Sequence, residues 1–139
     1  MRYCSENEIH ELVSKFEDAS VARDVWKHAE HLIVALVYVE RYGLEAGTDK
    51  MRGGLFNLLI KGFAVDLTKE MPYHETLTVF WMRTVADFAS SKNGASLLEK
   101  VNELTATYDK DYPLRFYSRE FLFSDEARAK FVNGDLETE

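Results

Sequence analysis

The pattern of apolar and polar positions along the chain is helical in every strong segment. The most apolar-rich stretch runs from Trp26 to Tyr42. Because a helix turns by about 100° per residue, the apolar residues of this stretch cover most of its circumference and leave a narrow polar strip. We therefore expect a buried central helix that begins at Ser20 and ends at Gly43. Its apolar part is much shorter than the roughly 20 residues that a membrane span needs.

Further helices follow from the same spacing and from end signals. Ser5 and Glu8 have the spacing of a capping box, which predicts a first helix directly after Ser5. Asp109 to Tyr117 contains Pro113 and is expected to be an extended loop across the domain. The other predicted helices cover residues 49–65, 74–90 and 95–108, with a short last one capped by Ser124.

These elements predict one all-α domain over residues 1–134, an antiparallel bundle of about five helices with an irregular C-terminal wrap. The acidic residues 135–139 are expected to form a loose tail. Gly54 and Gly62 border the apolar stripe of their helix. Each glycine weakens a helix by roughly 1 kcal/mol against alanine, so we expect another segment to approach closely at both positions.

Composition narrows the classes of function. The chain has 139 residues, 46% of them hydrophobic, and a net charge of −7. That charge argues against binding to nucleic acid or to an anionic membrane, both of which need a basic surface. Cys4 is the single cysteine, which excludes an internal disulfide and fits a reducing cytoplasm. The first twenty residues are charged and have no apolar core of a signal peptide.

Three histidines are the residues most suited to chemistry. His28 and His31 are three apart, so they leave one side of a helix about 60° apart, and Asp24 lies four residues before His28. His74 and Glu75 open a second helix after a proline. If the two helices are neighbours, His28, His31 and His74 can converge on one point.

Three imidazoles near a carboxylate suit a divalent transition metal such as zinc, nickel or iron. With an open coordination position the site would be a hydrolytic or oxidative centre, and in the hydrolytic version Glu75 would act as general base on a metal-bound water. Asp24 would contribute to ligand binding. Without a metal, the same residues form a pocket for a small polar ligand.

A structural interpretation stays open for each of these residues. His28 can be a core histidine bonded to a carbonyl or to Tyr42, and His31 can be solvated. His74 and Glu75 can simply shape a helix start, where an acidic residue is favourable. Motifs of the common hydrolases and nucleotide-binding proteins are absent, including HExxH, GxSxG, GxGxxG and CxxC.

Three segments resemble a widespread family of small uncharacterised bacterial proteins. They are WKHAEHL at 26–32, YHETLTVFW at 73–81 and YSREFLFSDEAR at 117–128. The resemblance implies a bacterial, cytoplasmic setting and directs attention to the same three histidines, but it implies no substrate. Members tend to carry a proline just before the W-x-H segment, whereas this chain has Val21 and Ala22 there.

Two hypotheses about function follow. In the first, a cytoplasmic helical protein has a pocket of His28, His31, His74 and Glu75 that binds a metal or a small polar ligand. In the second, the protein is a non-catalytic interaction module, a homodimer, whose histidines serve a structural hydrogen-bond network. The first requires the three imidazoles to face one cavity, and the second predicts an exposed apolar patch.

Overall fold

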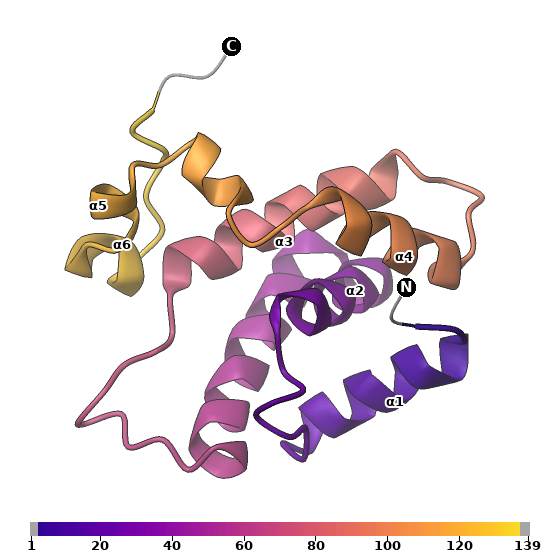
Figure 1. Ribbon diagram of the computed structural model, residues 1–139, viewed down its shortest axis with the longest axis horizontal. Helices are drawn as coiled ribbons and strands as arrows, with labels where there is room; N and C mark the ends of the chain where they lie inside the picture. Colours follow the sequence, from indigo (N-terminus) through magenta and orange to yellow (C-terminus); the bar gives the residue numbers. More distant parts are fainter. Residues whose placement is uncertain (1–2, 137–139) are drawn as a thin grey trace.

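The computed structural model describes residues 3–136, and that part of the chain is helical with no strand, which confirms the all-α class (Figure 1). Its α-helices are α1 (Glu6–Glu17), α2 (His28–Asn57), α3 (Glu75–Ser90), α4 (Leu97–Thr107), α5 (Arg119–Leu122) and α6 (Asp125–Ala129). A π-helical turn, η1 (Leu58–Gly62), continues α2, and a 3₁₀ turn, η2 (Tyr112–Arg115), follows α4.

Helix α2 is the centre of the molecule. Every residue from Leu32 to Tyr38 is buried. Helices α1, α3 and α4 all pack against α2, and α3 makes the most extensive contact. The predicted central helix is therefore present, and the two helices that carry the candidate histidines are in direct contact.

The start of this helix differs from the prediction. It begins at His28, not at Ser20, and the residues between them form turns. The helix starts here because the backbone N–H of Lys27 donates to the side chain of Glu30 (3.2 Å), which satisfies an amide at the helix end. Glu30 is buried and also accepts a hydrogen bond from the Tyr3 hydroxyl (3.1 Å).

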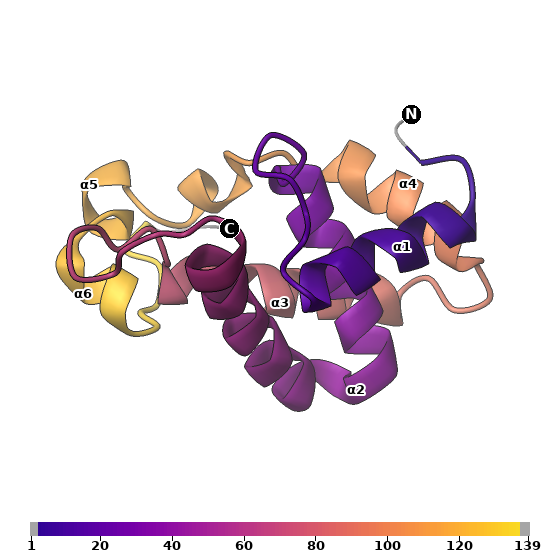
Figure 2. The ribbon, with the colours of Figure 1, turned by 90° about the horizontal axis from the view of Figure 1, so that it is seen from below.

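Gly43 bends α2 instead of ending it. Its φ of 84° lies in the left-handed region that glycine tolerates, and the chain returns to helical geometry directly afterwards. Figure 2 shows the two arms of α2 leaving this bend in different directions. The separate helix predicted for residues 49–65 is the second arm of α2, which passes into η1 after Asn57.

Close packing accounts for two glycines, as the sequence predicts. A Cβ atom on Gly54 would overlap the ring of Phe16 from α1. A Cβ atom on Gly62 would lie 2.8 Å from the carbonyl oxygen of Ala19. Gly54 thus allows α1 to approach the second arm of α2, and Gly62 allows the turn after α1 to approach η1.

The C-terminal residues form the irregular wrap. Residues 109–117 are not extended, because Pro113 is the second residue of the 3₁₀ turn η2, for which its fixed φ is suited. Helices α5 and α6 lie at the N-terminal end of α3, on the opposite side from α1 (Figure 1). Thr76 of α3 fixes this wrap, since its hydroxyl donates to the carbonyl of Lys130 (3.0 Å) and accepts from the amide of Val132 (3.2 Å).

The predicted acidic tail falls mostly outside the described residues. Asp135, its first residue, accepts hydrogen bonds from the amide (2.7 Å) and the hydroxyl (2.6 Å) of Ser118. Residues 137–139 lie beyond the described part of the chain. Within residues 3–136, no helix combines the length and the apolar character that crossing a membrane requires.

Candidate functional site

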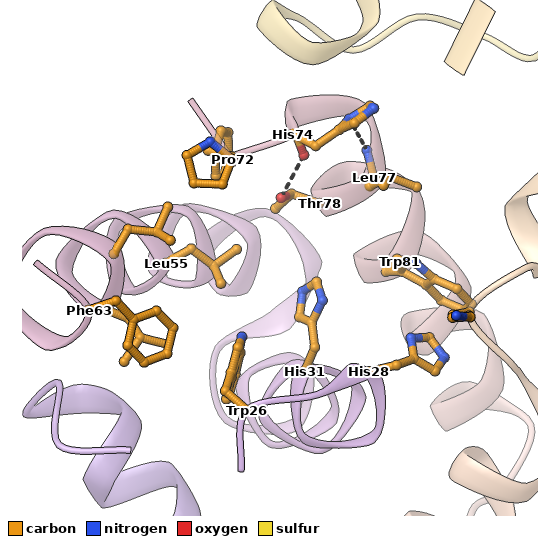
Figure 3. A pocket seen from close by; sticks show the side chains of 14 residues that line it. Trp26, His28, His31, Leu55, Phe63, Pro72, His74, Leu77, Thr78 and Trp81 are labelled. Carbon is orange, nitrogen blue, oxygen red and sulfur yellow. Dashed lines mark hydrogen bonds between the residues drawn. The ribbon is translucent and has the colours of Figure 1, made fainter. Parts of the chain in front are cut away.

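A cavity of about 310 Å³ lies between α2 and α3 (Figure 3). Its wall is mostly apolar, and all three candidate histidines line it. The lining residues are Trp26, His28, His31, Leu55, Leu58, Leu59, Phe63, Pro72, Tyr73, His74, Leu77, Thr78, Trp81 and Lys110. Only Pro72 and Lys110 among them are exposed, so the solvent-exposed part of the lining lies at these two residues.

His31 projects into this cavity. Its Nε2 is buried and has no hydrogen-bond partner within residues 3–136. The ring lies 6.1 Å from the Trp26 ring, between centroids, and Figure 3 shows the two side by side. Burial, together with the nearby His28, lowers the pKa of His31 to about 4, so the imidazole is neutral at physiological pH. Buried polar atoms without partners are rare and call for an explanation.

His28 lines the same cavity but has a structural bond. Its Nε2 lies 3.0 Å from the carbonyl oxygen of Tyr108, which follows α4. Its ring packs on Trp81 of α3, with centroids 4.9 Å apart. His28 therefore joins the start of α2 to α3 and to the end of α4. Of the two partners that the structural interpretation allowed, a carbonyl and Tyr42, the structure shows the carbonyl.

Both ring nitrogens of His74 are already used. Its Nε2 donates to the carbonyl of Leu122 in α5 (2.7 Å), and its Nδ1 accepts from the amide of Leu77 (3.2 Å). His74 is thus the N-cap of α3, and the two bonds fix the neutral tautomer with the proton on Nε2. Figure 3 shows the ring directed along α3 toward Leu77 and not toward His31.

Glu75 lies away from the cavity that the histidines line. It borders a second cavity of about 620 Å³ with Arg52, Phe56 and Phe131 among the lining residues. Arg52 binds both carboxylate oxygens of Glu75. Burial alone would raise the pKa of this carboxyl, but the hydrogen bonds from Arg52 and Tyr73 outweigh it, and the pKa lies below its ordinary value. A carboxylate held in this way is a weak base.

Asp24 is exposed in a turn and lines neither of these two cavities. The prediction placed it one helical turn before His28. That relationship is wrong, because α2 begins only at His28.

The described residues contain no group of three or more His, Cys, Asp or Glu side chains placed to hold a metal ion. Two of the three histidines use a ring nitrogen on a backbone carbonyl. The metal site therefore stays a prediction, and the donor geometry adds no support to it.

The Y-H-E-T segment, by contrast, has a structural explanation at each position. The Tyr73 hydroxyl donates to Glu75, and His74 caps the helix. Thr76 fixes the C-terminal wrap, and the Thr78 hydroxyl returns a bond to the carbonyl of His74 (3.0 Å). Through His74 and Leu122, this segment meets the YSREFLFSDEAR segment. Through Trp81 and His28, it meets the WKHAEHL segment.

Comparisons of the chain with protein-family models, with curated proteins and with solved structures gave no match. The resemblance described above therefore stays an expectation, and the geometry alone carries the functional argument.

Sequence reasoning missed part of the cavity. Trp26, Trp81 and Phe63 form aromatic walls, and Leu58 and Leu59 of the π-helical turn complete them. The aromatic residues carried a signal, because both tryptophans stand in the segments that hold the histidines. No pattern in the sequence indicated the π-helical turn, apart from the weak helix formers around it.

Proposed function

We propose that the protein binds a small organic molecule in the cavity between α2 and α3. The ligand has an apolar body and one hydrogen-bonding group, which pairs with Nε2 of His31. The observation that carries the proposal is this buried Nε2, because leaving such an atom unpaired costs on the order of 1–3 kcal/mol. A ligand group that pairs with it removes this cost.

Two further features support binding. The cavity is concave and mainly apolar with few polar groups, which is the usual character of a small-molecule site. One wall is built by Leu58 and Leu59 of η1, and π-helical turns are frequent at functional sites. The neutral imidazole of His31 suits a hydroxyl or an N–H group better than a cation.

The hydrolytic function expected from the sequence receives less support. Glu75 is held by Arg52 on the rim of the other cavity, and His74 turns its ring toward Leu77. Both residues position α3. We accordingly propose a binding function and leave the metal as a matter for measurement.

Tryptophan fluorescence offers a direct test, because the chain has two tryptophans and both line the cavity. Benzyl alcohol and toluene serve as probes of similar size, of which only the alcohol has a hydrogen-bonding group. We expect benzyl alcohol to change the emission saturably and to bind more tightly than toluene. The preference for the alcohol should disappear in His31→Leu.

The matched control is His10→Leu, which removes a histidine on the exposed face of α1 and should leave the preference intact. Equal affinities of the wild type for both probes would show that His31 does not bind the hydroxyl group of the ligand. Failure of both probes to alter the emission would overturn the proposed binding function.

The homodimeric module, the other hypothesis from the sequence, stays a prediction. The large exposed apolar side chains come from several parts of the chain; they are Val25, Tyr42, Leu44, Ile60, Met71, Phe123 and Leu136. Tyr42 and Leu44 flank the bend at Gly43 and are the pair that a dimer contact would use first. Sedimentation of the wild type beside a Tyr42→Ser/Leu44→Ser variant tests this hypothesis.

A further inference from the structure

The distribution of charge around the cavity is unlike that of the whole chain. The protein has 24 acidic and 17 basic residues. Among residues 3–136, no aspartate or glutamate lines the cavity, and Lys110 is the one lysine or arginine that does. In a strongly acidic protein, a cavity bordered by a single cation and no anion has a local preference for negative charge.

Lys110 is placed to act on a ligand. It is exposed in the turn that follows α4, and it lines the cavity. Several other lysines are engaged in ion pairs, for example Lys92 with Glu103 and Lys100 with Glu40. Lys110 has no ion pair within residues 3–136. Its ammonium group is therefore available to a ligand at the solvent-exposed part of the cavity lining, which we call the mouth.

The other lining residues among residues 3–136 include no aspartate, glutamate, lysine or arginine. They present the neutral ring of His31 together with leucine and aromatic side chains. Burying an ionised group there without a counter-charge would be costly. A charged group on the ligand consequently belongs at the mouth, and its apolar body and hydrogen-bonding group belong inside.

We infer that the ligand is a small amphipathic monoanion, such as an aromatic carboxylate with a hydroxyl group at the other end. Its carboxylate pairs with Lys110 at the mouth, its ring packs between Trp26 and Trp81, and its hydroxyl meets His31. This inference rests on the proposed function and adds the charge and the orientation of the ligand.

Three probes of matched size separate the possibilities. They are para-(hydroxymethyl)benzoate, para-(hydroxymethyl)benzamide and para-(hydroxymethyl)benzylamine, which are anionic, neutral and cationic. Tryptophan emission is followed at low and at high salt. Because an exposed ion pair contributes modestly, we expect the benzoate to bind about fivefold more tightly than the benzamide at low salt. Salt should reduce this ratio by screening.

Lys110→Gln should make the benzoate and the benzamide bind equally. Lys61→Gln is the control, because Lys61 is exposed in η1 beside the cavity but does not line it. The control makes the same change in net charge and should preserve the preference for the anion.

Each other result has a defined meaning. Equal binding of benzoate and benzamide in the wild type, or tighter binding of the benzylamine, overturns the inference and leaves the proposed binding function standing. An anion preference that both lysine variants lose equally reflects overall charge and also overturns the role of Lys110. If none of the three probes alters the emission, the proposed function fails together with the inference.

Discussion

Arg52 and Glu75 clamp the second arm of α2 to the first turn of α3. Nε of Arg52 lies 2.9 Å from Oε1 of Glu75, and Nη2 lies 2.7 Å from Oε2. Two parallel bonds between a guanidinium and a carboxylate define the orientation of both groups. This pair borders the second cavity and joins the same two helices that enclose the cavity of His31. Glu75 therefore positions α3.

Replacing Glu75 by glutamine should destabilise the protein by about 1–2 kcal/mol at neutral pH, because charged hydrogen bonds are lost within a partly buried pair. The pKa of Glu75 lies below its ordinary 4.5 in the folded state. Its contribution to stability is therefore present above pH 4.5 and is lost as the pH falls through the lower, folded pKa. Urea unfolding of Glu75→Gln and wild type at several pH values measures the difference.

Asp49→Asn is the matched control for this experiment. Asp49 is exposed and contacts the same arginine through Nη1, so its loss should change the stability by less than about 0.5 kcal/mol. Equal effects of the two substitutions would contradict the assignment of Glu75 as the clamp.

His31→Leu should make the protein more stable by about 1 kcal/mol at pH 7, because it removes a buried polar atom that has no partner in the described part of the chain. The gain should grow in acid. The folded pKa of His31 is about 4 against an ordinary 6.5, so the wild type loses stability as the pH falls from 6.5 toward 4, and the variant does not. Thermal unfolding between pH 4 and pH 7 follows both effects. A less stable variant at pH 7 would mean that Nε2 has a structural partner.

Two neighbouring glycines should respond oppositely to alanine. Gly53→Ala meets open space and should stabilise α2 by about 0.5–1 kcal/mol. Gly54→Ala drives a methyl group into the buried Phe16 ring and should destabilise the protein by about 1–3 kcal/mol. Phe16 stacks on Trp26 with centroids 5.0 Å apart, so Gly54→Ala should also change the tryptophan emission. Similar free energies of unfolding for both variants would contradict the packing of α1 on α2.

Protein purified without a histidine tag should carry much less than one equivalent of metal, and incubation with zinc, nickel or iron should not change that. The reason is that His28 and His74 bond to backbone carbonyls. Elemental analysis of the wild type beside a His28→Ala/His74→Ala double variant provides the measurement. Near-stoichiometric metal that the double variant loses would restore the metal site and give the identity of the ion.

Local signals in the sequence predicted much of the fold. The capping box of Ser5 and Glu8 is present, with the Ser5 hydroxyl accepting from the Glu8 amide (3.3 Å). Caps of this kind are readable because they involve residues three apart. The start of α2 could not be predicted from the sequence in this way, because its N-cap is Lys27, and lysine is not a usual capping residue.

The candidate site was predictable only in part. Spacing brought His28 and His31 together, and both line the cavity with His74. What each ring nitrogen binds depends on carbonyls 80 and 48 residues away along the chain, at Tyr108 and Leu122. No sequence pattern reports such contacts, so the difference between the unused His31 and its two engaged neighbours emerges only from the packing.

The most direct test of the central claim is the nitrogen chemical shift of His31, measured by NMR on protein labelled with nitrogen-15 in histidine. The account predicts that benzyl alcohol shifts the Nε2 resonance of His31 and leaves both His74 resonances in place, since those nitrogens are already bonded. A His31 resonance that does not respond to the probe, or a ring that titrates near pH 6.5 like an exposed histidine, would contradict the account.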